Sequence, residues 1–566
     1  MNFVLDTYGM LLNLLLVTEQ QHQNPMPDFN DTALETQLRR FLYLGKEGPE
    51  YQPGNWFVHN YFVAENLPSV YELAENPLKH DVVISLILEA KENKLVQNPE
   101  TLIFALAVCA QQDKSQELKK KAYDAVKKLC TTAEEFILFV KFCSHISKHK
   151  IQPKNGWGHG WRRAVKEWYL TKSPMTLAKI VTEGLHRYGW GHKDILKLAH
   201  MKVSNPDLEA VCCYILKGFK GLMVYKEEKG LSPEAEEVFK YIESIEDFKH
   251  CEDEVRGAAL IETLNLNLNH VPGHFLKSME VWDSLLISMS LTTLLKNLQR
   301  IHNMGFLSKN NALTNKVLDI LCKKNVEEEK IHPAQLYIAL KNYENSGKPL
   351  TFEKRKIREQ AKRPIPPPPE PNKMIVEKLK SLFNFSFECL EATNVNYMIT
   401  ISTNKNMENS CWKSGHIKAI EAAQIIALSI LKTEKIVTLA RFEKEGITLV
   451  ETDGQVSMAQ LKRKLETSYA DIFDANKPMT LAADSKKVVD VFINIVDQIH
   501  PKAETSEEGI RNYRAKSNLP NAKLINVTLC ATASNKPDFC DKNCLTICGF
   551  DGAVPRVIEA FARSYF

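Results

Sequence analysis

The sequence predicts a protein of two folded parts, a helical repeat array over residues 30–352 and a doubly wound α/β domain over residues 374–566. Apolar residues recur at three- and four-residue spacing up to about residue 350, and strand-like alternation is scarce there. A run rich in proline interrupts this pattern at residues 363–371. After the run, short apolar strands alternate with helices, which is typical of a largely parallel sheet covered on both faces.

The composition is that of a folded globular protein. The chain has 566 residues, of which 44% are hydrophobic and 25% charged, so a fibrous or wholly disordered protein is excluded. Thirteen cysteines, an odd number without a regular framework, favour reduced thiols and therefore the cytoplasm, with the nucleus as a second compartment. No apolar run reaches the ~18 residues of a membrane span. We expect a soluble monomer with no membrane contact and an N-terminal tail over residues 1–29.

Helix signals recur through residues 30–352. An apolar stripe covers residues 79–93. Cap signatures occur at Thr132 with Glu135, at Ser173–Pro174 and at Ser232–Pro233. Helices without a sheet to cover them must stack on one another, and antiparallel pairs stacked side by side form a solenoid. A single large irregular helical domain is the alternative.

Residues 353–373 are predicted to be a basic, proline-rich linker. Four consecutive prolines at 366–369 cannot continue a helix and favour an extended, stiff spacer. The same run could serve as a ligand for an SH3 or WW domain, although a single run at a change of fold is more often only a spacer.

The α/β part contains five predicted strands and four predicted helices. The strands are expected at 397–402, 435–442, 446–450, 491–497 and 523–529, and the helices at 416–432, 457–466, 506–516 and 554–563.

The loop after the first of these strands is the expected ligand position of such a sheet. Ser402, Asn404 and Asn406 alternate there, in a pattern similar to the divalent-cation site of adhesion-type domains, and Asp497 ends a later strand. The loop itself has no carboxylate, and a hard cation requires anionic oxygen, so we expect a degenerate pocket and disfavour a bound divalent cation. No glycine-rich nucleotide loop or hydrolase motif is found, so the sequence predicts neither a cofactor nor enzymatic activity.

Basic residues are concentrated between residues 141 and 203. This segment holds thirteen Lys and Arg against three acidic residues, together with six His and four of the seven Trp. Such a mixture of cationic and stacking groups suits a nucleic acid. Lys193, Lys197 and His200 have the spacing of one helix face, and a similar basic edge is formed by Arg162, Arg163 and Lys166. The alternative is a solvated basic face, with Trp157, Trp168 and Trp190 filling the core.

In these basic segments and in several others, the chain resembles the Ro/SS-A ribonucleoprotein autoantigen family, whose helical region is called the TROVE domain. The matching segments run in family order and are residues 37–48, 102–109, 155–169, 188–200, 281–286, 291–298, 331–333 and 548–551.

The resemblance implies a ring of HEAT-like helical repeats closed by a von Willebrand factor A-like domain. It also implies binding of small noncoding Y RNAs on the outer basic surface and of the 3′ ends of misfolded RNAs in the central hole. Arg187 and His200 match family residues implicated in RNA binding, with His192, Lys193 and Lys197 beside them. Glu183 stands where relatives carry a basic residue.

The sequence therefore predicts a non-enzymatic ribonucleoprotein component that acts in RNA stability and quality control. The alternative is a helical-repeat scaffold for protein interactions, with an adhesion-type A domain and no RNA ligand. In either case the A-like domain is a potential site for protein partners.

Overall fold

The computed structural model describes residues 31–566 except 55–61, 97, 151–155, 184–185, 309, 346, 348–368, 444–445, 466–473, 500–505 and 533–540. The predicted tail over residues 1–29 and most of the predicted linker over residues 353–373 lie outside the described residues.

The first part of the chain is helical, as the periodicity predicts. In chain order its elements are α2 (Asp31–Leu44), η1 (Ala64–Asn66), α3 (Pro68–Glu75), η2 (Pro77–Lys79), α4 (His80–Glu92), α5 (Glu100–Gln111), α6 (Gln116–Leu129), α7 (Ala133–Lys148), α8 (His159–Leu170), α9 (Pro174–Thr182), β2 (His186–Arg187), β3 (Trp190–Gly191), α10 (His192–Ala199), α11 (Pro206–Lys229), α12 (Pro233–His250), α13 (Glu254–Leu264), η3 (Phe275–Lys277), α14 (Met279–Leu285), α15 (Leu291–Asn303), α16 (Ala312–Ile320), α17 (Lys323–Glu328), α18 (Pro333–Glu344) and α20 (Lys373–Ser386).

Local signals start several of these helices where the sequence predicts them. The Thr132 side chain accepts from the Glu135 amide and the Glu135 side chain accepts in return, which makes the capping box at the start of α7. Ser173 and Ser232 cap α9 and α12, each followed by proline in the first turn.

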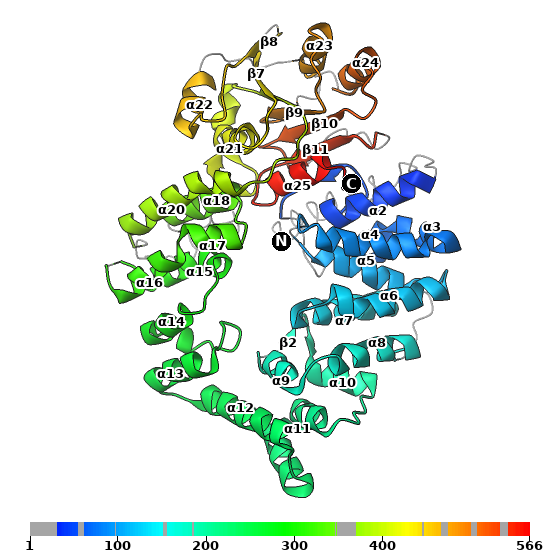
Figure 1. The fold of residues 1–566 in the computed structure, drawn as a ribbon, viewed down its shortest axis with the longest axis vertical. Helices are drawn as coiled ribbons and strands as arrows, with labels where there is room; N and C mark the ends of the chain where they lie inside the picture. Colours follow the sequence, from blue (N-terminus) through cyan, green and yellow to red (C-terminus); the bar gives the residue numbers. More distant parts are fainter. Residues whose placement is uncertain are drawn as a thin grey trace, which may run out of the picture.

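The helices stack in two layers along a closed path. Helix α6 packs between α4 and α8, and α8 packs on α10, while α5 packs on α7 in the other layer. Figure 1 shows this path descending from α2 through α6 and α8, turning at α11 and α12, and rising through α13 to α18. In the same view α8 and α10 lie on the outer side, and β2 and α9 face the middle. The array is therefore ring-like.

The second part of the chain is an α/β domain. Its elements are η4 (Phe387–Cys389), β4 (Tyr397–Ile401), η5 (Lys405–Glu408), β5 (Ser410–Cys411), β6 (Ser414–Lys418), α21 (Ala419–Leu431), β7 (Val437–Glu443), β8 (Gly446–Leu449), α22 (Met458–Leu465), α23 (Lys477–Asp484), β9 (Val491–Val496), α24 (Glu507–Ser517), β10 (Lys523–Thr528), β11 (Cys544–Cys548) and α25 (Val554–Ala562).

The described sheet of this domain has seven strands in the order β1-β11-β10-β9-β4-β7-β8, in which β1 (Glu50–Tyr51) comes from the helical part, and only β8 pairs antiparallel. Its strands are nearly continuous runs of buried apolar residues, as expected of a sheet covered on both faces. Met398 and Phe492 pack in a core with residues of α23 and α24, whereas Ile399 belongs to a separate, larger core that includes α21 and α25. Successive residues of β4 thus enter opposite faces.

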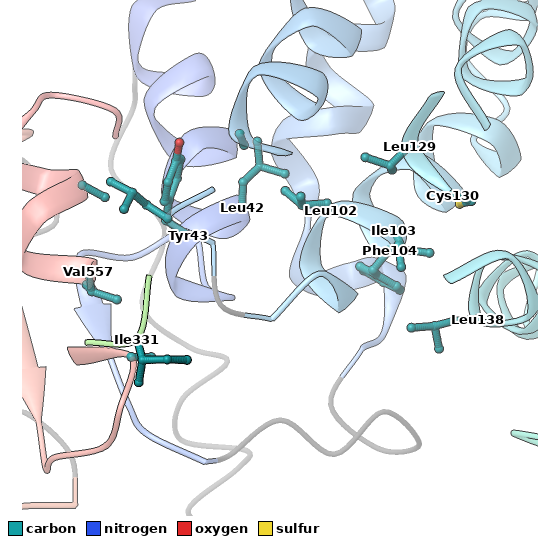
Figure 2. Close-up of a cluster of buried hydrophobic side chains, with 14 of the residues drawn as sticks. Leu42, Tyr43, Leu102, Ile103, Phe104, Leu129, Cys130, Leu138, Ile331 and Val557 are labelled. Carbon is teal, nitrogen blue, oxygen red and sulfur yellow. The ribbon is translucent and has the colours of Figure 1, made fainter. Parts of the chain in front are cut away.

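The N-terminal part of the array closes onto this sheet. Strand β1 (Glu50–Tyr51) pairs parallel with β11. The Tyr43 ring stacks on Phe566 with centroids 5.1 Å apart. Figure 2 shows Tyr43 in the same buried cluster as Val557 of α25 and Ile331. One hydrophobic core therefore runs from the first helices into the α/β domain.

Helix α20 joins the other end of the array to the sheet. It packs on α17 and α18, and α18 in turn contacts α21 and β6. The Asn372 side chain caps α20, and its backbone amide donates to the Tyr343 hydroxyl at 3.3 Å. The chain that emerges from the proline-rich segment is thus anchored on the helical array before it enters the sheet.

Candidate functional site

Two helices that pack against each other, α8 and α10, carry six of the predicted basic residues: Arg162, Arg163, Lys166, His192, Lys193 and Lys197. Lys193 and Lys197 are exposed and stand one turn apart on α10. His200 is also exposed, but it is the C-cap of α10 with a left-handed backbone (φ 49°). Helical spacing therefore places Lys193 and Lys197 on one face, and does not extend that face to His200.

The basic side chains of α8 are partly engaged with neighbouring groups. The Arg162 Nε donates to the carbonyl oxygen of Trp157 at 2.7 Å. The Arg163 guanidinium lies 2.7 Å from Asp124 and 3.6 Å from Glu167, so its charge is partly balanced. Lys166 is half-buried and has no ion pair within the described residues.

His192 lies in the interior, unlike the other predicted residues of α10. It is 7% exposed, and its Nδ1 and the Tyr169 hydroxyl are hydrogen-bonded at 2.7 Å. Burial lowers the pKa of His192 to about 4, so the ring is neutral at physiological pH. It anchors α10 on α8 rather than presenting a charge at the surface.

Arg187 lies on the β2–β3 hairpin and is held by two groups. Its guanidinium is 2.5 Å from Glu134 at the start of α7, and it donates to the Asn269 side chain at 3.0 Å. Asn269 belongs to the loop after α13. Glu183, which stands where the resemblance implies a basic residue, accepts a hydrogen bond from the side chain of Asn267 in the same loop at 3.0 Å. Arg187 therefore links two parts of the ring, and a phosphate would have to compete with Glu134 for it.

The tryptophans of the segment fill the core, as the alternative interpretation states. Trp157 and Trp161 are buried and stack with centroids 4.3 Å apart, and Trp168 stacks on Phe136 at 4.0 Å. Trp190 is half-buried and packs against the same core. They therefore do not form a stacking surface for bases.

The structure adds a third helix to the basic surface. Lys120, Lys127 and Lys128 are exposed on α6, which packs directly on α8. The lysines of α6 occur in two runs, 119–121 and 127–128, which could have indicated a basic helix. They were missed because they precede residues 141–203, the segment with the charge excess. We define the outer basic face as six lysines of these three neighbouring helices, five exposed and one, Lys166, half-buried: Lys120, Lys127, Lys128, Lys166, Lys193 and Lys197.

The degenerate pocket lies at the carboxyl end of β4. Ser402, Asn404 and Asp497 are buried, whereas Asn406 is exposed on η5. The Asn404 Nδ2 donates to Asp497 Oδ1 at 2.7 Å, and the Asn404 Oδ1 accepts from the Met407 amide at 3.1 Å. Both the Nδ2 and the Oδ1 of the Asn404 side chain are therefore already hydrogen-bonded.

These contacts do not fit the divalent cation that this type of fold implies. A cation needs oxygen ligands, but an amide N–H is directed at Asp497, the carboxylate of the described part of the pocket. Within the described residues, no group of three or more His, Cys, Asp or Glu side chains could hold a metal ion. Among the helices described, none combines the length and the apolar character needed to cross a bilayer.

Comparison with known proteins yields two family models and several relatives. A model described as the TROVE domain matches residues 35–429, and one described as the Ro60 vWA domain matches residues 396–562. A Caenorhabditis elegans protein named RNA-binding protein RO60 is 26% identical over 599 aligned residues, which cover 93% of this chain and 87% of that protein. A Deinococcus radiodurans protein of the same name is 23% identical and aligns over 96% of each chain.

Among solved structures, the crystal structure of the Deinococcus radiodurans RO (RSR) protein superimposes with a TM-score of 0.79 at 22% identity. The superposition covers 94% of this chain and all of that one. Together with the architecture described above, these matches confirm the predicted fold class, a ring-like helical array followed by a von Willebrand factor A-like domain.

Proposed function

Because the chain belongs to the TROVE-domain family, we propose that it is an RNA-binding protein that holds structured RNA on the outer basic face. The names of both curated relatives support RNA as the ligand. The observation that carries the proposal is the exposure of lysines on α6 and α10, with the half-buried Lys166 on α8, which packs against both helices in one layer of the ring.

The finer proposal concerns which RNAs are bound. We propose small noncoding Y RNAs on the outer basic face and the 3′ ends of misfolded RNAs in the middle of the ring, where a paired stem is excluded by size. The protein would then act in RNA stability and quality control as a monomeric ribonucleoprotein without catalytic activity, in the cytoplasm and also in the nucleus.

The binding mechanism that the lysines support is charge neutralisation. Each phosphate paired with a lysine releases condensed counterions, so affinity falls by about 0.7–0.9 log units per contact for each tenfold rise in salt. Exposed lysines are suited to this because they give up few protein contacts on binding. Such contacts position an RNA without reading its sequence.

The test is filter binding of a structured small RNA across a salt series. The double variant Lys193→Glu with Lys197→Glu is expected to weaken binding and to flatten the salt slope by about 0.7–0.9 for each lost contact. Lys435→Glu, which reverses an exposed charge on the A-like domain, is the matched control. Retention that is absent or independent of salt would instead support a protein-interaction scaffold.

The 3′-end proposal has a separate test. The same hairpin RNA is compared with and without a single-stranded 3′ extension, at one salt concentration. Tighter binding of the extended RNA supports engagement of the end, and equal affinity contradicts it.

A further inference from the structure

A large cleft lies at one edge of the helical array, where the C-terminal ends of α5 and α7 meet the N-terminal ends of α6 and α8. Its volume is about 1380 Å³. Pockets for small molecules usually have about 300–1,000 Å³, so this cleft is better matched to a short polymer segment. None of the residues discussed for the degenerate pocket lines it.

Charged side chains of both signs line the cleft, and the basic ones predominate. Among the described lining residues, Lys119, Lys120, Lys150 and Arg163 face two acidic side chains, Glu65 and Asp113. Asp113 lies 2.8 Å from the Lys150 ammonium and 3.2 Å from that of Lys119. This ion pairing lowers the pKa of Asp113 despite partial burial. The remaining positive charge suits a polyanion.

Aromatic and histidine side chains also line the cleft. Tyr71 and Tyr123 line the cleft, together with His145 and His149, whose rings are 4.2 Å apart. Aromatic and histidine side chains beside cations are the usual platform for unstacked nucleobases, because every base offers a π-face. A paired stem keeps its bases stacked inside the helix and cannot use these rings.

The cleft is continuous with the outer basic face. Lys120 belongs to that face and also lines the cleft, and Arg163 lines the cleft from α8. An RNA whose paired stem lies across α6 and α8 would therefore have its backbone beside the mouth of the cleft.

From the lining and this continuity, we propose that the cleft binds an unpaired RNA segment of a few nucleotides that continues from the stem held on the outer basic face. This inference rests on the proposed function and extends it to a second subsite. The bases would lie against the rings of Tyr71, Tyr123, His145 and His149, and the phosphates would approach Lys120 and Arg163.

Gly158 offers a way to close the cleft without changing charge. It lines the cleft, its φ of −64° is accessible to any residue, and no atom lies within 4 Å of a Cβ placed there. Gly158→Phe should therefore place a ring in the cleft without strain. Gly158→Ala keeps the cleft open at the same position. Gly446→Phe, at another open glycine in the A-like domain, is the control for an added ring.

The experiment measures fluorescence anisotropy with two probes, a single-stranded uridine octamer and a blunt-ended hairpin RNA. Gly158→Phe is expected to weaken octamer binding by about tenfold or more, the scale of losing one stacked base, and to leave hairpin binding within about twofold. Gly158→Ala and Gly446→Phe should bind both probes as the unaltered protein does. Melting temperatures of all variants show whether each is folded.

Photo-crosslinking of a 4-thiouridine octamer to the unaltered protein tests the cleft without the Gly158→Phe variant. Crosslinks to residues 145–150 or 159–163 support the cleft, and crosslinks only elsewhere overturn it. A protein that binds the hairpin but not the octamer, or a folded Gly158→Phe variant that keeps octamer affinity, also overturns the cleft and leaves the proposed function standing. A protein that binds neither probe overturns both.

Discussion

The side-chain amide of Asn404 donates a hydrogen bond to a carboxylate oxygen of Asp497 over 2.7 Å, and both side chains are buried. A buried carboxylate needs a counter-charge or hydrogen-bond donors to remain ionised. In cation-binding domains of this kind a divalent ion meets that need. Here the amide N–H of Asn404 meets part of it from within the chain, so we expect the domain to fold without an ion.

Asn404→Asp is expected to make this domain dependent on metal. The substitution keeps the oxygen that accepts from the Met407 amide, but it replaces the donor facing Asp497 with a second carboxylate. In EDTA the free energy of unfolding should fall by about 2–4 kcal/mol, because two buried carboxylates repel each other. Millimolar Mn²⁺ or Mg²⁺ should restore much of the loss, since a bound ion stabilises the native state.

Thermal melts with EDTA and with each ion provide the measurement. The unaltered protein should show the same melting temperature in all three, and Asn404→Ala, which lacks the second carboxylate, should be destabilised without rescue by metal. Metal-dependent stability of the unaltered protein would contradict the assignment of Asn404 as the replacement.

His192 should make stability depend on pH in a defined window. Its pKa is about 4 in the folded protein against an ordinary value of 6.5, so the unfolded chain binds the proton more readily. The stabilisation is complete above pH 6.5 and is lost as the pH falls toward 4, by about 3 kcal/mol. His192→Gln should reduce the pH dependence by that amount.

Urea unfolding at pH 7.5 and at pH 4.5 gives the two free energies, and their difference is compared between the variant and the unaltered protein. The comparison isolates His192, because buried His332, whose pKa is lowered to about 3, contributes equally to both proteins. Since His192 is neutral and interior, the salt slope of RNA binding should not change. A flatter slope would assign it a charged role at the surface.

Local sequence predicts five of the seven strands of the described sheet, but neither β11 nor the edge strand β1. Buried strands such as β4 and β9 are nearly continuous apolar runs, and they occur within a residue of their expected bounds. Strand β1 has two residues and no periodicity, and its Tyr51 meets Asp551 at a separation of 500 positions. Pairing of this kind is fixed by tertiary packing, which no local pattern encodes.

The candidate site, like the sheet, could be predicted from the sequence only in part. Exposure of Lys193 and Lys197 follows from the helical period, and the sequence predicts it. Burial of His192 depends on the position of Tyr169 on the preceding helix, and the orientation of His200 depends on a left-handed C-cap. The lysines of α6 join the face because α6 packs on α8, a contact between helices that charge counting along the chain does not reveal.

Glu134→Gln should strengthen RNA binding if Arg187 contacts phosphate. The Glu134 carboxylate is 2.5 Å from the Arg187 guanidinium and would compete with a phosphate for it. Removing that charge should make the salt slope steeper by about 0.7–0.9, the value of one additional contact. The pair is half-exposed, so the loss of stability should stay within about 1 kcal/mol.

Filter binding across a salt series and a thermal melt test this expectation. The double variant Glu134→Gln with Arg187→Ala is the control and should show no gain in slope. If Glu134→Gln leaves the slope unchanged and lowers the melting temperature, Arg187 serves only to join the hairpin to the loop that carries Asn269.

Tyr51→Phe should loosen the closure between the first helices and the sheet. The Tyr51 hydroxyl donates to the Asp551 carboxylate at 3.1 Å, which also accepts from the amides of Ala553 and Val554. Loss of the hydroxyl leaves the half-buried Asp551 carboxyl group short of one donor, at a cost of about 1 kcal/mol. Because β1 pairs only through two residues, this cost should appear first as local opening.

Hydrogen exchange of the β11 amides tests this, since the Thr546 amide donates to the carbonyl of Pro49 beside β1. Tyr51→Phe should accelerate exchange at Thr546, while amides of β9 in the centre of the sheet stay protected. Tyr565→Phe removes the hydroxyl of another tyrosine near the same junction, one with no hydroxyl partner within the described residues, and should leave exchange unchanged. Equal exchange at Thr546 in both variants would mean that packing of Tyr43 on Phe566, and not the Tyr51 hydroxyl, holds the ring closed.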